Sequence, residues 1–195
     1  MIKAIQTEYN GYKFRSRLEA RWAVFFDTLG IEYEYEPEGY ELKNGMKYLP
    51  DFYLPDLNLW VEVKGFLTEY DEGKIRNFAI GKKVALLREI PNPKQDEIFN
   101  VISWSPYGEN GKFLAGEMYS GEICENGEPM YIWDAPYTFC VCPACGKIGY
   151  EFEGRGGRVC GHEYLGDKEY SGAHPKLLNA YKKARQARFE HGERP

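Results

Sequence analysis

The sequence predicts a mixed fold of the α/β or α+β class, in which helices flank a central mixed sheet and a small cysteine-rich module and a final helix are added. Apolar residues recur at helical spacing over residues 16–29, and a second helix is indicated over residues 69–80. Apolar runs typical of strands are found at residues 31–36, 47–54, 59–64 and 83–90. This mixture of helical and strand patterns favours a sheet covered by helices.

The composition indicates a soluble globular protein. The chain has 195 residues, of which 43% are hydrophobic and 28% charged, enough for one core or a core with a small appendage. It contains no apolar run long enough to cross a bilayer, and its first 17 residues lack the apolar segment of a secretion signal. We therefore expect a cytoplasmic protein without a membrane partner, whose cysteines stay reduced and bind metal.

Four segments follow from these patterns. We expect a core over residues 1–105, a β-rich connecting segment of short strands and turns over 106–137, a metal-binding module over 138–165 and a basic helical segment over 166–195. Residues 175–195 carry six Lys or Arg and two Glu, so a chain of net charge −5 has a local charge of +4 there and −9 elsewhere. Such a tail fits phosphate binding and a solvated helix face equally well. Its helix is expected to begin at Pro175 and to run to residue 190.

A predicted hairpin carries unexpected charges. Residues 55–58, Pro-Asp-Leu-Asn, are typical of a turn between two apolar strands. With that turn, paired residues sum to 113, so Asp51 lies opposite Glu62. Because side chains alternate along a strand, Lys64 shares the face of Glu62. Pro50 complicates this register, since proline donates no ladder hydrogen bond.

Two carboxylates at opposed positions of a hairpin repel each other, so their presence there needs an explanation. Side chains at opposed positions are roughly 5 Å apart at Cβ, a distance at which like charges destabilise a hairpin. A divalent cation such as Mg²⁺ or Mn²⁺, which prefers oxygen ligands, would relieve the repulsion between Asp51 and Glu62. Lys64 beside them could orient water or stabilise phosphate charge. The alternative is that the acids face water and Lys64 is an ordinary salt-bridge partner.

These residues resemble a known signature. Pro50-Asp51 followed by Glu62-Val63-Lys64 resembles the PD-(D/E)xK nuclease superfamily, and the stretch is most similar to small PD-(D/E)xK proteins of tailed bacteriophages. The resemblance covers about the first half of the chain and implies a restriction-endonuclease-like core.

The resemblance also implies a site and an activity. Asp51, Glu62 and the Val63 carbonyl would bind catalytic Mg²⁺, Lys64 would be the catalytic lysine, and Glu19 would be the accessory acid. The implied activity is Mg²⁺-dependent, endonucleolytic hydrolysis of DNA. RNA stays open as a substrate, and a homodimer stays open as an assembly.

Glu19 has other interpretations. It lies beside the apolar stripe of the first predicted helix. It could complete a capping box with Ser16, or form an ion pair with Arg15 four residues earlier. Arg15, Arg17 and Arg21 are candidate phosphate contacts, or part of a solvated basic face.

The cysteine cluster indicates a zinc site. Two thiolates in Cys142-Pro-Ala-Cys145-Gly can chelate one tetrahedral Zn²⁺. A return hairpin over residues 148–159 would bring back a second pair and give a zinc-ribbon layout. Our preferred ligands are Cys142, Cys145, Cys160 and His162, with Cys140 or His174 as substitutes. Four protein ligands leave no position for a substrate, so the expected role is structural.

Basic residues complete the candidate DNA surface. Arg155 and Arg158 near the tip of the return hairpin are grouped with basic residues of the last predicted helix, Lys182, Lys183, Arg185 and Arg188, whose alternative is a solvated helix face. A function from another class also fits, namely a non-catalytic adaptor that binds nucleic acid or protein through the zinc ribbon on a nuclease-like fold.

Overall fold

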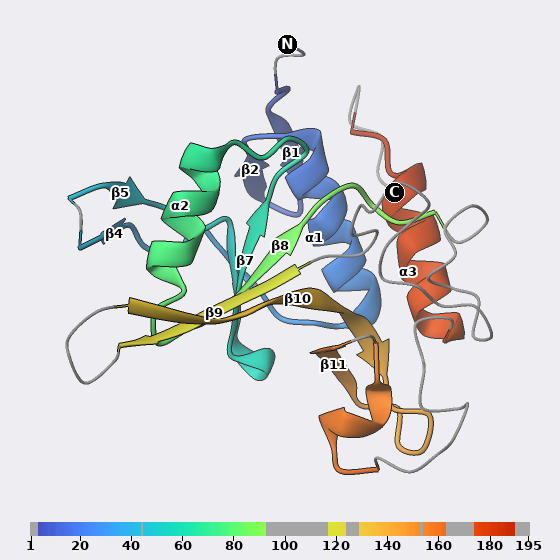
Figure 1. The fold of residues 1–195 in the computed structure, drawn as a ribbon. Coiled ribbons are helices and arrows are strands. Elements are labelled where there is room, and N and C mark those ends of the chain that lie inside the picture. Colours follow the sequence, from blue (N-terminus) through green and yellow to red (C-terminus); the bar gives the residue numbers. More distant parts are fainter. Residues whose placement is uncertain are drawn as a thin grey trace.

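A computed structural model describes residues 4–43, 45–92, 117–123, 129–152, 154–162 and 174–189. These residues form a mixed α/β fold around a seven-stranded sheet of order β11-β10-β9-β8-β7-β6-β3 (Figure 1). The sheet strands are β3 (Glu34–Tyr35), β6 (Phe52–Leu54), β7 (Leu59–Val63), β8 (Lys83–Leu87), β9 (Glu117–Ile123), β10 (Pro129–Val141) and β11 (Ile148–Phe152). Adjacent strands are antiparallel except β7 and β8, which are parallel. The predicted mixed central sheet is thus confirmed.

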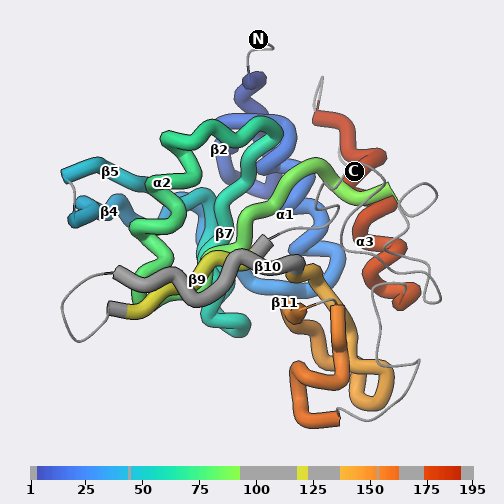
Figure 2. Tube along the Cα trace, in the orientation of Figure 1, coloured from blue at the N-terminus to red at the C-terminus, as the bar shows by residue number. Residues whose placement is uncertain are grey.

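Helices cover both faces of the sheet. They are α1 (Arg17–Leu29), α2 (Glu69–Phe78) and α3 (Pro175–Gln186). On β8, Ala85 and Leu87 pack into the core that α1 and α3 complete, whereas Val84 and Leu86 pack under α2. This alternation is the expected period of a strand that is buried on both faces. Figure 2 shows the chain path, with α3 running beside α1 although the two are far apart in the sequence.

The first helix follows the sequence closely. Ser16 caps α1, since its Oγ accepts a hydrogen bond from the backbone N–H of Glu19 at 3.2 Å. Gly30 ends the helix in the left-handed region with φ 71°. The prediction for residues 16–29 is therefore confirmed to within one residue. Predicted elements 31–36, 69–80, 83–90 and 175–190 are also found, each shorter than expected.

The predicted strand over residues 47–54 is wrong as one element. The chain forms β5 (Lys47–Tyr48), which pairs with β4 (Tyr40–Glu41) in a separate hairpin, and then β6 in the main sheet. Pro50 lies between them, and a proline cannot donate to a ladder. A further hairpin, β1 (Thr7–Tyr9) with β2 (Tyr12–Phe14), precedes α1.

The register of the β6–β7 hairpin is confirmed. Leu54 pairs with Leu59 and Phe52 with Val61, so paired residues sum to 113. The turn is a 3₁₀ helix, η1 (Pro55–Leu57), and Asn58 closes it with φ 45°. The hairpin prediction therefore gave the right turn and the right pairing.

The cysteine-rich part continues the main sheet. β10 extends from its pairing with β9 to Val141 beside the knuckle, so the expected boundary between residues 137 and 138 lies inside one strand. The predicted return hairpin over 148–159 is wrong, because β11 pairs with β10 and the chain returns as a 3₁₀ helix, η3 (Gly156–Val159). Gly149 permits this packing, since a Cβ there would meet Val159 Cγ2 at 2.4 Å.

Parts of the predicted segments lie outside the described residues, including 106–116, 163–173 and 190–195. Within the described residues, no helix has both the length and the apolar character that a membrane span requires.

Candidate functional site

The two opposed carboxylates are buried. Asp51 is 1% exposed and Glu62 is 3% exposed. Asp51 immediately precedes β6, and Glu62 is the fourth residue of β7. The interpretation in which both acids face water is therefore wrong. Buried carboxylates are rare unless paired. The start of β6 and the end of β7, which hold these two acids, are therefore the natural candidate for a functional site.

Asp51 is held by two donors. Its Oδ2 accepts the backbone N–H of Val63 at 2.7 Å, and its Oδ1 bonds the guanidinium of Arg15. Burial raises the pKa of Asp51 well above its usual range, and the charges of Glu62 and Glu19 raise it further, against the opposing effect of Arg15. Three carboxylates thus act on one another at the carboxyl end of β7.

Glu62 has a cationic and a neutral partner. Its Oε1 bonds Lys64 Nζ at 2.9 Å, and its Oε2 accepts the hydroxyl of Tyr48 at 2.7 Å. Tyr48 was not predicted to reach this site, because a single strand over 47–54 would place Tyr48 and Asp51 on opposite faces. The bend at Pro50 removes that restriction, and Tyr48 reaches the Glu62 carboxylate from β5.

Lys64 remains a cation in this setting. Burial alone would lower the pKa of Lys64, but the charges of Glu62 and Asp51 outweigh burial and raise it. The ammonium group therefore keeps its proton at neutral pH. Its chemistry here is that of a fixed positive charge and hydrogen-bond donor, and a role as general base does not fit.

Glu19 is a buried acceptor that also takes part in the helix cap. It is 6% exposed. Its Oε1 accepts the Ser16 hydroxyl at 2.7 Å, and its Oε2 accepts the Tyr35 hydroxyl at 2.8 Å and the Arg15 backbone N–H at 3.1 Å. Glu19 thus bonds the hydroxyl of the cap residue Ser16, a contact that differs from the reciprocal backbone bond of a capping box. The Arg15 guanidinium turns to Asp51 and to Glu36 Oε1, at 2.6 Å. Sequence reasoning missed Tyr35 and Glu36, which have no signature spacing from Glu19.

The Cys and His side chains form a second candidate site. The ligand atoms of Cys142, Cys145, Cys160 and His162 all lie within 4.8 Å of one another, so this cluster could hold a metal ion. Cys145 Sγ lies 3.3 Å from Cys160 Sγ, and His162 Nδ1 lies 3.0 Å from Cys160 Sγ and 3.5 Å from Cys142 Sγ. Three thiolates with one imidazole are a donor set that suits Zn²⁺. Among the residues described, it is the one group of three or more Cys, His, Asp or Glu with this geometry.

The thiol pKa values are consistent with a metal site. Burial alone would raise the pKa of Cys142, but hydrogen bonds from the backbone N–H groups of Cys145 and Ala144 help lower it to about 6. At Cys160, burial and the neighbouring thiols raise the pKa to about 11. A divalent cation would allow all the thiols to ionise together.

The substitute ligands lie outside this cluster. Cys140 is buried, and its Sγ lies 3.6 Å from the Gly149 carbonyl oxygen. The His174 ring caps α3, where Nδ1 accepts the Lys176 backbone N–H at 3.2 Å. Of the sets considered, the preferred four are therefore the residues that the structure brings together.

The candidate nucleic-acid residues fall in two places. Arg158 is exposed and Arg155 half-buried, both at η3, whereas Lys182, Lys183 and Arg185 are exposed on α3. The carboxyl end of α3 and η3 lie at different ends of the molecule (Figure 1). Arg15 and Arg17 are at the start of α1. The structure therefore separates Arg155 and Arg158 from the candidates on α1 and α3.

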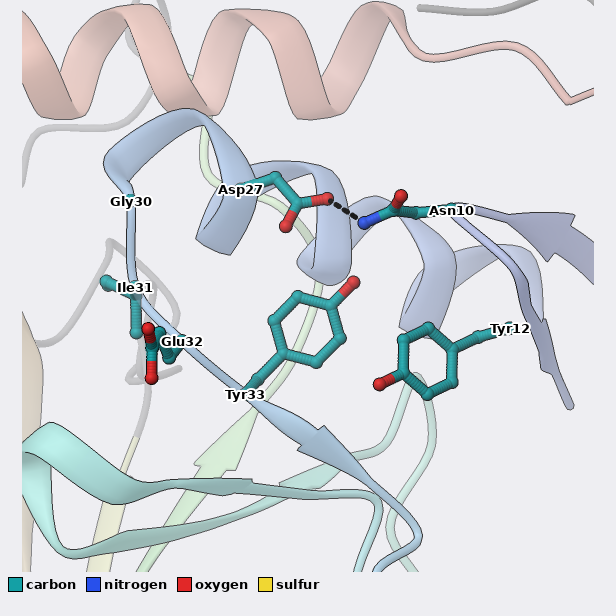
Figure 3. Close-up of a pocket in the computed structure, with 7 residues that line it drawn as sticks. All are labelled: Asn10, Tyr12, Asp27, Gly30, Ile31, Glu32 and Tyr33. Carbon is teal, nitrogen blue, oxygen red and sulfur yellow. Dashed lines mark hydrogen bonds between the residues drawn. The ribbon is translucent and has the colours of Figure 1, made fainter.

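A hollow of 390 Å³ lies between the β1–β2 turn and the end of α1 (Figure 3). Asn10 Nδ2 donates to Asp27 Oδ2 at 3.4 Å, and the Tyr33 hydroxyl points towards this pair. Burial and the charge of Asp27 raise the pKa of Tyr33 to about 12. The lining contains no basic side chain, so it is a weaker candidate for phosphate chemistry than the acidic pair.

No family model matches this chain, and no curated protein and no solved structure matches it. The argument for a function therefore starts from the geometry of the two sites.

Proposed function

We propose that this protein is a metal-dependent nuclease with a restriction-endonuclease-like core that hydrolyses phosphodiester bonds in DNA endonucleolytically. The observation that carries the proposal is the buried pair Asp51 and Glu62, at neighbouring strand positions, with Lys64 bonded to Glu62. Buried like charges at this spacing destabilise the fold, and the binding of a catalytic metal would explain why both carboxylates are buried there. The parallel β7–α2–β8 unit that carries Glu62 and Lys64 also fits the nuclease resemblance.

The side chains fit Mg²⁺ or Mn²⁺ by their chemistry. Asp51 and Glu62 are oxygen donors, and each carboxylate oxygen can accept more than the one bond described above. The Val63 carbonyl lies on the same edge of β7 as its N–H, which Asp51 accepts, because both backbone groups of a strand residue point to one neighbour. These three groups would hold the ion. When bound, it would supply an acidified water and neutralise phosphate charge.

Each neighbouring side chain then has a role of its own. Lys64, held as a cation by Glu62, stabilises the negative charge that develops on the phosphate. Glu19 accepts hydrogen bonds on both oxygens and orients the attacking water from the α1 side. Arg15 releases Asp51 when the site is loaded, and its guanidinium then bonds a phosphate oxygen.

The Cys142, Cys145, Cys160 and His162 cluster has a structural role in this proposal, with Zn²⁺ as its ion. All four positions of a tetrahedral ion would be filled by the protein. Cys142 directly follows β10, and Cys160 directly follows η3. An ion bound by both residues would therefore link the end of β10 to η3.

A cleavage assay tests the proposal. The purified protein is incubated with linear, circular, branched and single-stranded DNA, and with RNA, in Mg²⁺, Mn²⁺ or EDTA. Cleavage in Mg²⁺ or Mn²⁺ should stop in EDTA and fall at least about a hundredfold in Glu62→Gln, the scale of losing one strong electrostatic contribution. Glu72→Gln is the matched control, since Glu72 pairs with Arg76 on α2 away from β7. The absence of cleavage by the wild type in both metals would refute the proposal.

One observation favours the adaptor as a second candidate. Arg15 and Lys64 already supply positive charge to Asp51 and Glu62 without a metal. An adaptor would use this charge-paired centre as a structural element and bind nucleic acid or protein through the Cys/His part. Calorimetric titration with Mg²⁺ separates the two, since the nuclease should bind the ion and lose binding in Asp51→Asn, whereas the adaptor should show no such binding.

A further inference from the structure

Helices α1 and α3 pack side by side and run in opposite directions. The Tyr181 ring stacks on Phe25 with centroids 4.6 Å apart, and the edge of Trp22 meets it at 6.4 Å. From this contact, one turn back along α1 leads to Arg21 and then Arg17. One turn forward along α3 leads to Arg185, and Arg188 follows just past the end of the helix. The antiparallel pair therefore places Arg17 and Arg21 of α1 next to Arg185 and Arg188.

The electrostatics agree with this geometry. Arg21 is half-buried, and its Nε is enclosed without a hydrogen-bond partner in the described part of the chain. Burial lowers the pKa of Arg21, and the positive charges of Arg17, Arg185 and Arg188 lower it further. Residues 175–189 contain five Lys or Arg and no Asp or Glu, so α3 itself brings no acid to balance them. The cluster is a concentration of positive charge on a chain whose net charge is −5.

The cluster lies at the same edge of the sheet as the acidic pair. Arg185 Nη1 donates to the Ile90 carbonyl at 2.7 Å, and Trp22 Nε1 donates to the Arg88 carbonyl at 2.9 Å, both just past the end of β8. Lys64, just past the end of the parallel strand β7, donates its backbone N–H to Leu87 of β8 at 2.9 Å. Figure 1 shows the start of α1, the end of α3 and the ends of β7 and β8 at one end of the molecule.

We propose that Arg17, Arg21, Arg185 and Arg188 form a phosphate-binding surface that holds the nucleic-acid backbone beside the acidic pair. This inference rests on the proposed function for its choice of partner, a nucleic acid. It adds the surface of the protein along which the nucleic-acid backbone would lie. Lys182 and Lys183 are not needed for the cluster, which instead joins basic residues that the sequence placed in two separate candidate groups.

The shape of the cluster favours a nucleic acid over a small anion. Arg17 and Arg21 lie on α1, whereas Arg185 lies on α3 and Arg188 just past its end, and the axes of packed helices are typically about 8–10 Å apart. Neighbouring positions on each helix add about 5–6 Å along the axis. A single phosphate ion cannot contact so extended a set, whereas successive phosphates of one strand can. Arginine also bonds phosphate in a two-pronged manner, which orients the backbone.

The test removes two charges from the cluster and, as a control, two from elsewhere. Arg21→Gln with Arg188→Gln is compared with Lys43→Gln with Lys47→Gln, which are exposed on the β4–β5 hairpin on the other side of the molecule (Figure 1). Binding of a labelled DNA duplex is measured by fluorescence anisotropy in EDTA, so that cleavage does not interfere, at several salt concentrations.

The arginine variant should bind at least tenfold more weakly than the wild type, and the slope of log affinity against log salt should fall by about two, one for each lost contact. The lysine variant should keep the wild-type slope. The melting temperature of the arginine variant should stay level or rise, because Arg21 Nε has no partner to lose and a repulsion is removed. Equal slopes for wild type and arginine variant would overturn the inference.

Further arms separate this inference from the proposed function and from other ligands. A wild type that binds duplex through the arginines but cleaves nothing in Mg²⁺ or Mn²⁺ would refute the nuclease and leave the surface standing. A wild type that cleaves DNA while the arginine variant binds it normally would refute the surface alone. If inorganic phosphate raises the melting temperature of the wild type and duplex binding is unaffected by the substitutions, the cluster is a small-anion site and the inference fails. Stronger arginine-dependent binding of RNA than of DNA would overturn the choice of DNA.

Discussion

The two candidate sites of this protein differ in what surrounds their ligand atoms. In the Cys/His cluster, four ligand atoms face one another within 4.8 Å. At the acidic pair, each carboxylate already has a positively charged side chain, Arg15 for Asp51 and Lys64 for Glu62.

The difference indicates how each site would treat an ion. Thiols that crowd together without a balancing cation need a permanent metal to ionise together. Carboxylates that are paired with cationic side chains cost the fold less stability when no metal is bound, so an ion can enter and leave the site. On this comparison, we propose that the cluster would hold its ion as a fixed part of the fold, whereas the acidic pair would hold an exchangeable one. The following predictions test the contrast, from the largest expected effect to the smallest.

The largest effect is expected at the cluster. Cys145→Ser should lose the bound metal and destabilise the protein by several kcal/mol, since structural zinc contributes about 10–16 kcal/mol of apparent binding energy in small zinc domains. Metal content is measured by elemental analysis and stability by thermal unfolding. Cys140→Ala is the control and should keep the metal, because the Cys140 thiol lies outside the cluster. Wild-type protein purified without any metal would contradict the prediction.

The next effect concerns Lys64. Lys64→Gln removes the cation bonded to Glu62 and should lower the rate of DNA cleavage by about 10²–10³. Lys74→Gln is the control, because Lys74 bonds Asp71 within α2 at 3.6 Å and should leave the rate unchanged. Equal rates for both variants would show that the lysine has no part in the chemistry.

Glu19 allows a sharper distinction between cap and acid. The carbonyl oxygen of a glutamine can still accept the Tyr35 hydroxyl, and its amide group can donate to the Ser16 hydroxyl oxygen, so Glu19→Gln should leave the melting temperature almost unchanged. Loss of the charge that orients water should nevertheless reduce cleavage by about a hundredfold. A variant that cleaves at the wild-type rate would assign Glu19 to the cap alone.

The smallest effect is a gain of stability. Because the folded-state pKa of Asp51 is raised, protonation of this group favours the folded state, and the benefit is lost as pH rises through that pKa. Asp51→Asn should therefore stabilise the metal-free protein at neutral pH by on the order of 1 kcal/mol, a common scale for single substitutions. The difference should vanish near pH 4 and reverse when Mg²⁺ is added to the wild type. Denaturant unfolding at both pH values measures it, and a variant less stable than the metal-free wild type at pH 7 would contradict it.

Local patterns were enough to predict much of the site. Alternation and the Pro55–Asn58 turn gave the opposed positions of Asp51 and Glu62, and the cysteine spacing gave the four ligand residues. Both rest on contacts between residues close in sequence, whose geometry the chain itself restricts.

Contacts made by bends and by distant segments were not predictable. The break at Pro50 places Tyr48 on Glu62, and no spacing rule foresees such a bend. The structure has a 3₁₀ helix before Cys160 and His162 where the sequence predicted a strand. This helix was not predictable because it depends on a tertiary contact, the close approach of Val159 to Gly149.

The bond between the Val63 N–H and Asp51 Oδ2 gives the site a built-in spectroscopic signal. The β6–β7 ladder ends at the pair Phe52 and Val61, so the amide proton of Val63 has no ladder partner on β6 and instead depends on one ionisable side chain. Deprotonation of Asp51, or the arrival of an ion on it, should move the nitrogen and proton resonances of this amide. The rate at which its proton exchanges with solvent should change as well. One cross-peak in a two-dimensional NMR spectrum would therefore follow the charge and occupancy of the site in solution, without a substrate and without any substitution.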